Sequence, residues 1–167
     1  MNAAIAARRS IRKYRTDKPV TEEQAKQLLT AAMLAPSAKN SRPWEFIVLT
    51  NREILNEIAH FHPYGKMLLQ APMAIIVVAA PGPKVPEDYL PQDCGAATQN
   101  ILLEAVDMGL GTCWCGIFPR EDRVTRMAEL LDIPAPKFPF CVIAVGVPDE
   151  APAQRGFYEE SKVSFVE

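Results

Sequence analysis

Hydrophobic residues recur at helical spacing in three parts of the chain. Residues 21–34 are predicted to form an amphipathic helix, and Thr21 and Gln24 match a capping box at its start. Residues 92–110 give the strongest helical pattern, apolar around most of the helix. We therefore expect that helix to be buried, either in the core or at a subunit interface. A third helix is predicted to start at Pro119.

Continuous apolar runs predict buried strands at residues 46–49, 74–79 and 140–146. Asn51 is placed to cap a further helix that runs to residue 58, and residues 163–166 could add one more strand. Helices and strands alternate irregularly, without regular βαβ units. The pattern predicts an α+β fold with one sheet flanked by helices, in a single domain covering residues 1–167.

Composition narrows the functional classes. The chain has 167 residues, a formal net charge of −2 and 49% hydrophobic residues, with a pI near 5.8. An acidic balance argues against general nucleic-acid binding. No apolar run approaches the roughly 18 residues of a membrane span, and a secretory signal is not recognisable near the start. We therefore expect a cytoplasmic protein that binds neither nucleic acid nor membrane.

The cysteines and histidines do not predict a metal site. Cys113 and Cys115 are one residue short of a C-x-x-C motif, and Cys141 lies within a predicted strand. His60 and His62 lie in a turn-rich segment without a third ligand nearby. We interpret the four cysteines as reduced core or near-site thiols and the two histidines as loop residues.

The densest cationic cluster covers residues 8–14, with the sequence Arg-Arg-Ser-Ile-Arg-Lys-Tyr. Arginine offers paired N–H donors and a permanent charge, and serine adds a neutral donor, so the cluster suits a compact polyanion. The other interpretation is a solvated basic turn at the end of a short helix. Residue types alone do not decide between the two.

Several catalytic motifs are missing. Residues 109–114 begin like a dinucleotide fingerprint, but Trp114 stands at the last glycine position and the segment follows a helix. The sequence contains neither a Walker loop nor a G-x-S-x-G motif. An enzyme built from this chain would need a cofactor to supply its chemistry.

Three segments in register resemble the nitroreductase family of FMN enzymes. They are residues 8–14, residues 35–44 (Ala-Pro-Ser-Ala-Lys-Asn-Ser-Arg-Pro-Trp) and residues 109–116 (Gly-Leu-Gly-Thr-Cys-Trp-Cys-Gly). Lys66 and the Ala71-Pro72 pair fit a fourth segment. The resemblance covers nearly the whole chain. It implies a mainly antiparallel central sheet and a domain-intertwined homodimer, with FMN bound at the interface and residues 150–167 packed on the partner subunit.

The resemblance also implies roles for individual residues. The phosphate, ribityl chain and pyrimidine edge of FMN would be held by Arg8, Arg9, Ser10 and Arg12, with Lys66 also at the pyrimidine edge. The partner subunit would contribute Pro36, Ser37 and Ala38, with Asn40 fixing their loop. Cys115 and Gly116 would lie against the isoalloxazine, a backbone N–H meeting N5. Arg155 is the candidate that completes the phosphate site, with Lys162 as its competitor.

The implied reaction passes a hydride from NAD(P)H through flavin N5 to an electron-poor acceptor by ping-pong exchange. A nitroaromatic, a quinone or free flavin could be that acceptor, and fixed cations at the pyrimidine edge would favour the reduced flavin. No proton-transferring side chain is needed, so we predict no catalytic side chain.

Three departures from the family pattern leave questions open. Arg42 stands where relatives usually have Gln, Cys113 and Cys115 lie beside the presumed flavin face, and the segment from 81 to 92 is short. The two thiols are either tolerated small residues or a redox pair. The sequence does not choose between NADH and NADPH, nor does it name the acceptor. A flavin-binding or flavin-delivery protein without turnover is the alternative function, because the same residues would hold FMN.

Overall fold

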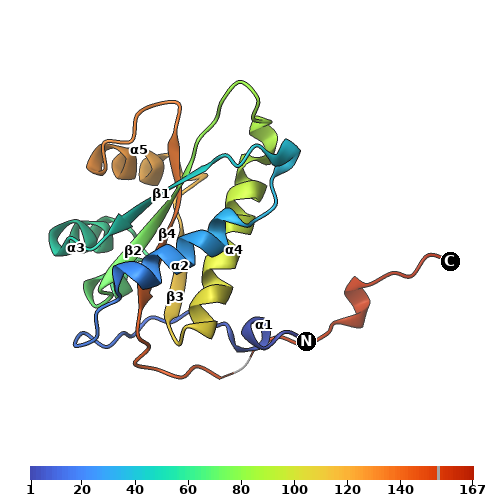
Figure 1. Cartoon of the computed structure of the whole chain (residues 1–167), viewed down its shortest axis with the longest axis horizontal. Helices are drawn as coiled ribbons and strands as arrows, with labels where there is room; N and C mark the ends of the chain where they lie inside the picture. Colours follow the sequence, from blue (N-terminus) through green and yellow to red (C-terminus); the bar gives the residue numbers. More distant parts are fainter. Residues whose placement is uncertain (154) are drawn as a thin grey trace.

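A four-stranded antiparallel sheet forms the centre of the chain in a computed structural model, which describes residues 1–153 and 155–167 (Figure 1). The strands are β1 (Trp44–Leu49), β2 (Met73–Ala79), β3 (Gly111–Gly116) and β4 (Phe138–Gly146), in the order β1-β2-β4-β3. All three strand pairs are antiparallel. The sheet confirms the predicted α+β class.

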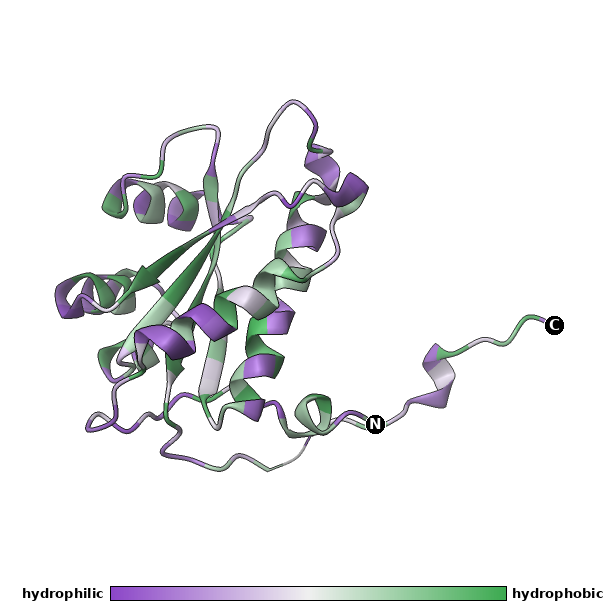
Figure 2. Cartoon of the chain, in the orientation of Figure 1, coloured by the Kyte–Doolittle hydropathy of each residue, from purple (hydrophilic) through white to green (hydrophobic). Residues whose placement is uncertain are grey.

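Helices cover both faces of this sheet (Figure 1). One face packs against α2 (Glu22–Met33) and α4 (Leu90–Asp107). The other packs against α3 (Arg52–Phe61), α5 (Glu121–Leu130) and the 3₁₀ turn η2 (Lys66–Leu69). Successive residues of β2 therefore belong to opposite cores, and all seven are buried. Figure 2 shows this strand as almost uniformly hydrophobic.

Local sequence signals set several helix boundaries as predicted. The Thr21 hydroxyl accepts from the Gln24 amide at 3.2 Å, and the Gln24 side chain accepts from the Thr21 amide at 2.9 Å. Asn51 caps α3 by accepting from two backbone amides. The third predicted helix begins at Glu121, two residues after Pro119. The starts of α2 and α3 were predictable because each depends on a side-chain cap within one turn, whereas α5 starts without a side-chain cap.

Two parts of the chain differ from the prediction. Residues 111–116, which the sequence did not mark as a strand, form β3 at the edge of the sheet. Residues 163–166 form no strand; the described tail contains one 3₁₀ turn, η4 (Glu160–Lys162). Figure 1 shows the tail extending away from the rest of the chain.

The remaining elements are short: the helix α1 (Ala3–Ala7) and the 3₁₀ turns η1 (Ala38–Asn40) and η3 (Glu87–Tyr89). Over the described ranges, each helix is too short or too polar to cross a membrane.

Candidate functional site

The basic segment after α1 is fixed along the outer edge of β3. The Ile11 amide donates to the Thr112 carbonyl at 2.9 Å, and Ser10 forms a bridge with the same strand residue. Tyr14 is buried, and its hydroxyl donates to the Ile11 carbonyl at 2.7 Å. Burial is the main reason that the pKa of Tyr14 lies above its usual range. Tertiary contacts therefore hold the segment against the sheet.

Four arginines line a cavity of about 340 Å³ beside this segment. The lining comprises Arg8, Arg9, Ser10, Arg12, Glu150, Pro152, Ala153 and Arg155. Among the described residues, none of these arginines forms an ion pair. Arg155 therefore lines one space with the four side chains predicted to hold the phosphate, ribityl chain and pyrimidine edge. That space is cationic, as a phosphate dianion requires.

Glu150 organises this cavity from the irregular segment that follows β4. Its carboxylate accepts from the backbone amides of Arg12 and Lys13, at 3.2 Å for the latter. Arg9 donates from Nε to the Ala153 carbonyl at 3.2 Å. The single carboxylate in the lining is thus occupied with backbone donors, and the four guanidinium groups outweigh its charge.

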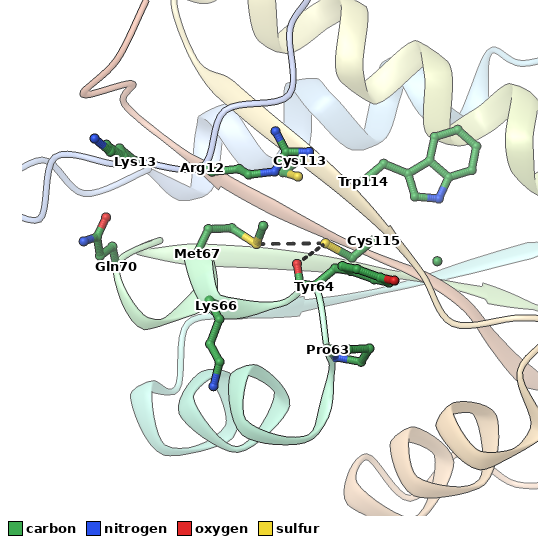
Figure 3. Close-up of a pocket in the computed structure, with 11 residues that line it drawn as sticks. Arg12, Lys13, Pro63, Tyr64, Lys66, Met67, Gln70, Cys113, Trp114 and Cys115 are labelled. Atoms are coloured by element: carbon green, nitrogen blue, oxygen red, sulfur yellow. Dashed lines mark hydrogen bonds between the residues drawn. The ribbon is translucent and has the colours of Figure 1, made fainter. Parts of the chain in front are cut away.

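A second cavity, of about 650 Å³, adjoins the first through Arg12. Its walls come from the basic segment, from the turn between α3 and β2, and from β3 (Figure 3). The lining residues are Arg12, Lys13, Pro63, Tyr64, Lys66, Met67, Gln70, Cys113, Trp114, Cys115 and Gly116. The predicted Lys66, Cys115 and Gly116 are therefore brought together with Arg12. In Figure 3, Lys66 extends from η2 away from Arg12 and Cys113.

The edge position of β3 decides which of its amides face the cavity. In an antiparallel strand the N–H and C=O of one residue point to the same side, and the side alternates along the chain. The Thr112 carbonyl faces outward to Ile11, so Trp114 and Gly116 also face outward. Cys113 and Cys115 instead face β4. The outward donor at this end of the strand is the Gly116 N–H.

Two side chains hold Gly116 in place. His62 Nε2 lies 2.9 Å from the Gly116 carbonyl, and Arg123 Nη1 donates to the same oxygen at 3.1 Å. Arg123 also lies over the Tyr64 ring, 5.7 Å from its centroid. Burial lowers the pKa of His62, so the neutral imidazole is favoured. His62 lies in the loop after α3, as predicted, and its side chain is fully buried beside the site. His60, also predicted as a loop residue, instead lies in the last turn of α3.

The pKa values of the two thiols of β3 are shifted in opposite directions. Interaction with the Cys115 thiol lowers the pKa of Cys113 to about 7, and the positive charge of Arg12 acts in the same direction against burial. The same interaction, with burial, raises the pKa of Cys115. Its Sγ lies 3.3 Å from the Tyr64 carbonyl. A proton retained on Cys115 therefore favours the thiolate of Cys113.

The other predicted flavin contacts lie outside both cavities. Pro36, Ser37, Ala38 and Asn40 belong to the loop around η1, near the start of α4, whereas the basic segment lies beside the other end of that helix (Figure 1). The Ala38 amide donates to Asp93 Oδ1 at 3.0 Å. One chain thus does not bring this loop to its own cationic cavity.

The same loop has an unusual backbone. Lys39, Asn40 and Arg42 all have φ near +50°, a conformation that costs energy for residues other than glycine. Arg42 donates from Nη2 to the Met33 carbonyl at 3.1 Å, which ties the loop to α2.

The structure distinguishes the two residues of the tail that were candidates for completing the phosphate site. Arg155 lines the cationic cavity, whereas Lys162 lies outside its lining and pairs with Glu159 at 2.6 Å. Their binding roles stay predictions, but the geometry favours Arg155.

Sequence reasoning missed several residues of the second cavity. Tyr64, Met67 and Gln70 come from the turn around η2, and no motif distinguished them from ordinary turn or core residues. A usable signal was the adjacency to Lys66, since four of the lining residues fall between 63 and 67. Arg123 had no signal, because only the fold brings α5 next to β3.

Known proteins match this chain in sequence over most of its length. The Nitroreductase family model matches residues 5–62 and 61–147. A protein of Methanothermobacter thermautotrophicus named "Putative NADH dehydrogenase/NAD(P)H nitroreductase" is 46% identical over 160 residues, which cover 96% of this chain and 83% of that protein. A protein of the same name from Archaeoglobus fulgidus is 45% identical, covering 93% of this chain and 87% of the relative.

Solved structures agree over the whole length. An FMN-dependent nitroreductase from Clostridium difficile R20291 superposes with a TM-score of 0.90 at 32% identity, covering 100% of this chain and 99% of that one. A Clostridium acetobutylicum protein described as a "Putative NADH Oxidase" gives a TM-score of 0.93 at 39% identity, covering 98% and 99%. Given these matches and the register of all three motifs, the chain belongs to the nitroreductase family of oxidoreductases.

Proposed function

We propose that this chain is an FMN-dependent oxidoreductase that takes a hydride from NAD(P)H and delivers it to a small electron-poor acceptor. The observation that carries the proposal is the pair of adjoining cavities joined at Arg12, one cationic and one lined by an exposed strand edge. Named relatives add support, since one is an NADPH-flavin oxidoreductase of Vibrio harveyi, 29% identical over 89% of this chain.

The residues present fit FMN at both ends of the molecule. Its phosphate suits the cavity of Arg8, Arg9, Ser10, Arg12 and Arg155, where guanidinium groups and a hydroxyl supply charge-assisted hydrogen bonds. The larger cavity has the volume of a typical cofactor pocket, about 300–1,000 Å³. Arg12 stands between the two, where one molecule with a polar chain and an aromatic ring would pass.

Bound FMN would supply the redox chemistry, accepting a hydride at N5 and releasing it to the acceptor. The protein would orient the ring and stabilise charge. Gly116 offers the outward N–H toward the ring, and His62 and Arg123 keep that residue in place. Arg12, with Lys66 as a second candidate, offers the positive charge that favours negative charge on the pyrimidine edge.

Donor and acceptor would use the larger cavity in turn, which corresponds to ping-pong exchange. No proton-transferring side chain is proposed. A nitroaromatic, a quinone or free flavin fits an open cavity with an aromatic side chain, Tyr64, in its wall.

We further propose that the active form is a homodimer with intertwined subunits. The loop carrying Pro36, Ser37, Ala38 and Asn40 would reach the cavity of the partner, since it does not reach its own. The tail would pack on the partner subunit. Its aromatic side chains support this, because Phe157 and Phe165 are each 85% exposed in the single chain.

The test is an absorbance experiment on the purified protein with FMN under nitrogen. Addition of NADH or NADPH should bleach the band at about 450 nm that any bound oxidised flavin gives. A nitroaromatic or quinone should then restore it. A yellow protein that neither donor bleaches would contradict turnover and favour the alternative of flavin binding or delivery.

A further inference from the structure

Three sulfur-bearing side chains from two separate elements line the larger cavity. Met67 comes from η2, and Cys113 and Cys115 come from β3. Cys115 Sγ lies 3.9 Å from Met67 Sδ, as marked in Figure 3. The two cysteines are two residues apart on one strand, so their side chains lie on the same face of the sheet. All three residues line the same cavity.

These sulfurs are screened from bulk solvent but not enclosed. Met67, Cys113 and Cys115 are 6%, 3% and 5% exposed, and the cavity that they line opens to the surface. A small ion could therefore reach them while the surrounding side chains exclude most of the water.

The chemistry of this set selects a soft cation. Thiolate and thioether ligands favour Cu(I) over hard ions such as Mg²⁺ or Ca²⁺. In trigonal coordination, metal–sulfur bonds of about 2.3 Å separate the sulfur atoms by about 4 Å. The 3.9 Å between Cys115 Sγ and Met67 Sδ matches that separation without movement of either residue. In residues 1–153 and 155–167, no three His, Cys, Asp or Glu side chains form a metal-binding group, so the thioether is required as third ligand.

The charge of Cu(I) bound to these sulfur ligands would also be compensated. Two thiolates and one Cu(I) carry a net charge of −1, and Figure 3 shows the Arg12 side chain beside Cys113. The guanidinium group lines the same cavity and offsets that charge.

We propose that Met67, Cys113 and Cys115 form a binding site for Cu(I) in the flavin-free chain. On binding, each thiol releases its proton to solvent and forms a Cu–S bond, and Met67 donates a lone pair. Copper stays in the +1 state, so no electron is transferred. The site does not depend on the proposed oxidoreductase function.

The other two cysteines provide matched controls. Cys94 and Cys141 are also free and buried, but they belong to the opposite core and outside the lining of this cavity. Cys141 lies beside the Thr98 hydroxyl at 3.5 Å. Replacing either with serine removes a thiol from the chain without changing the proposed ligands.

The experiment titrates the full-length, flavin-free protein, with its thiols reduced, into the coloured Cu(I) complex of bathocuproine disulfonate under nitrogen. We expect one Cu(I) to be withdrawn per chain. Cys113→Ser and Cys115→Ser should each weaken binding by more than about 100-fold, beyond the effect of losing a supporting residue. Met67→Leu should weaken it about tenfold, and Cys94→Ser and Cys141→Ser should bind as the unchanged protein does.

X-ray absorption at the copper edge adds an independent readout. Three sulfur neighbours are expected in the unchanged protein and two in Met67→Leu. Failure to withdraw copper from the chelator, or equal binding by Cys115→Ser and Cys141→Ser, would overturn the proposal. Either failure would leave the FMN proposal intact, because that proposal rests on the arginine cavity and the edge of β3.

Discussion

Replacing Gly111 with alanine should destabilise the protein and disturb the cationic cavity at once. Gly111 begins β3, directly under the basic segment. A Cβ atom there would lie 2.7 Å from Ile11 Cγ1, 2.9 Å from Ile11 Cβ and 2.9 Å from Pro148 Cγ. These approaches are too close, and Cβ of Ile11 cannot turn away by a change of rotamer. The basic segment itself must move.

The expected cost follows from this geometry. Extra methyl groups in close-packed sites cost about 1–3 kcal/mol, while alanine lowers the entropy of the unfolded chain by an offsetting 0.4–1 kcal/mol or so. The net loss should be about 1–2 kcal/mol. For a chain of this length, that corresponds to a Tm lower by about 2–8 °C.

Urea unfolding at a fixed protein concentration measures this change, since the stability of the proposed dimer would depend on concentration. Gly95→Ala is the matched control. Gly95 lies inside α4, and its added Cβ would meet only Trp114 Cη2, at 3.8 Å. Helix propensity predicts that Gly95→Ala gains about 0.5–1 kcal/mol. If Gly111→Ala proved as stable as the unchanged protein, the proposed packing of residue 11 on β3 would be refuted.

Three further predictions concern separate parts of the chain. Arg8→Ala should weaken FMN binding about 10- to 100-fold, the equivalent of one charge-assisted hydrogen bond, whereas Lys162→Ala should leave FMN binding unchanged. Flavin fluorescence quenching measures both affinities. An equal effect of the two substitutions would argue against the phosphate role of Arg8. Thr21→Ala should lower the free energy of unfolding by about 1 kcal/mol by removing the capping box of α2, and a chemical-denaturation midpoint equal to that of the unchanged protein would contradict it. His62, whose pKa is lowered in the folded state, should make the protein less stable as the pH falls below about 6.5, because the unfolded chain then binds the proton more readily. His62→Gln should flatten this part of the pH–stability curve, and an unchanged slope would show that His62 does not contribute to it.

Helix ends and buried central strands could be predicted from the sequence because their causes are local. Thr21 and Gln24 cap α2 from within one turn, and the apolar run of β2 is long enough to indicate burial on both faces. The edge strand β3 was not predictable in this way. Its sequence begins and ends with glycine, which is depleted in strands, and its pairing with β4 is long-range.

The candidate site likewise has a part that could be predicted from the sequence and a part that could not. Its cationic half was recognisable because Arg8, Arg9, Ser10 and Arg12 are contiguous in the chain. Only folding brings Tyr64 into the lining of the second cavity and Arg123 against Gly116 and Tyr64. The burial of His62 behind Gly116 also arises only on folding. Arg155 could not be separated from Lys162 by sequence, since only the path of the tail places one of them in the cavity.

If the arginine cavity holds the phosphate of FMN, a comparison of FMN with riboflavin tests this role most directly. The two share the ring and differ only in the phosphate, so titration of the flavin-free protein by fluorescence quenching isolates that end of the site. FMN should bind at least about 100-fold more tightly than riboflavin, because several charge-assisted hydrogen bonds would go to the phosphate. Equal affinity for the two flavins would contradict it, as would the absence of binding by either.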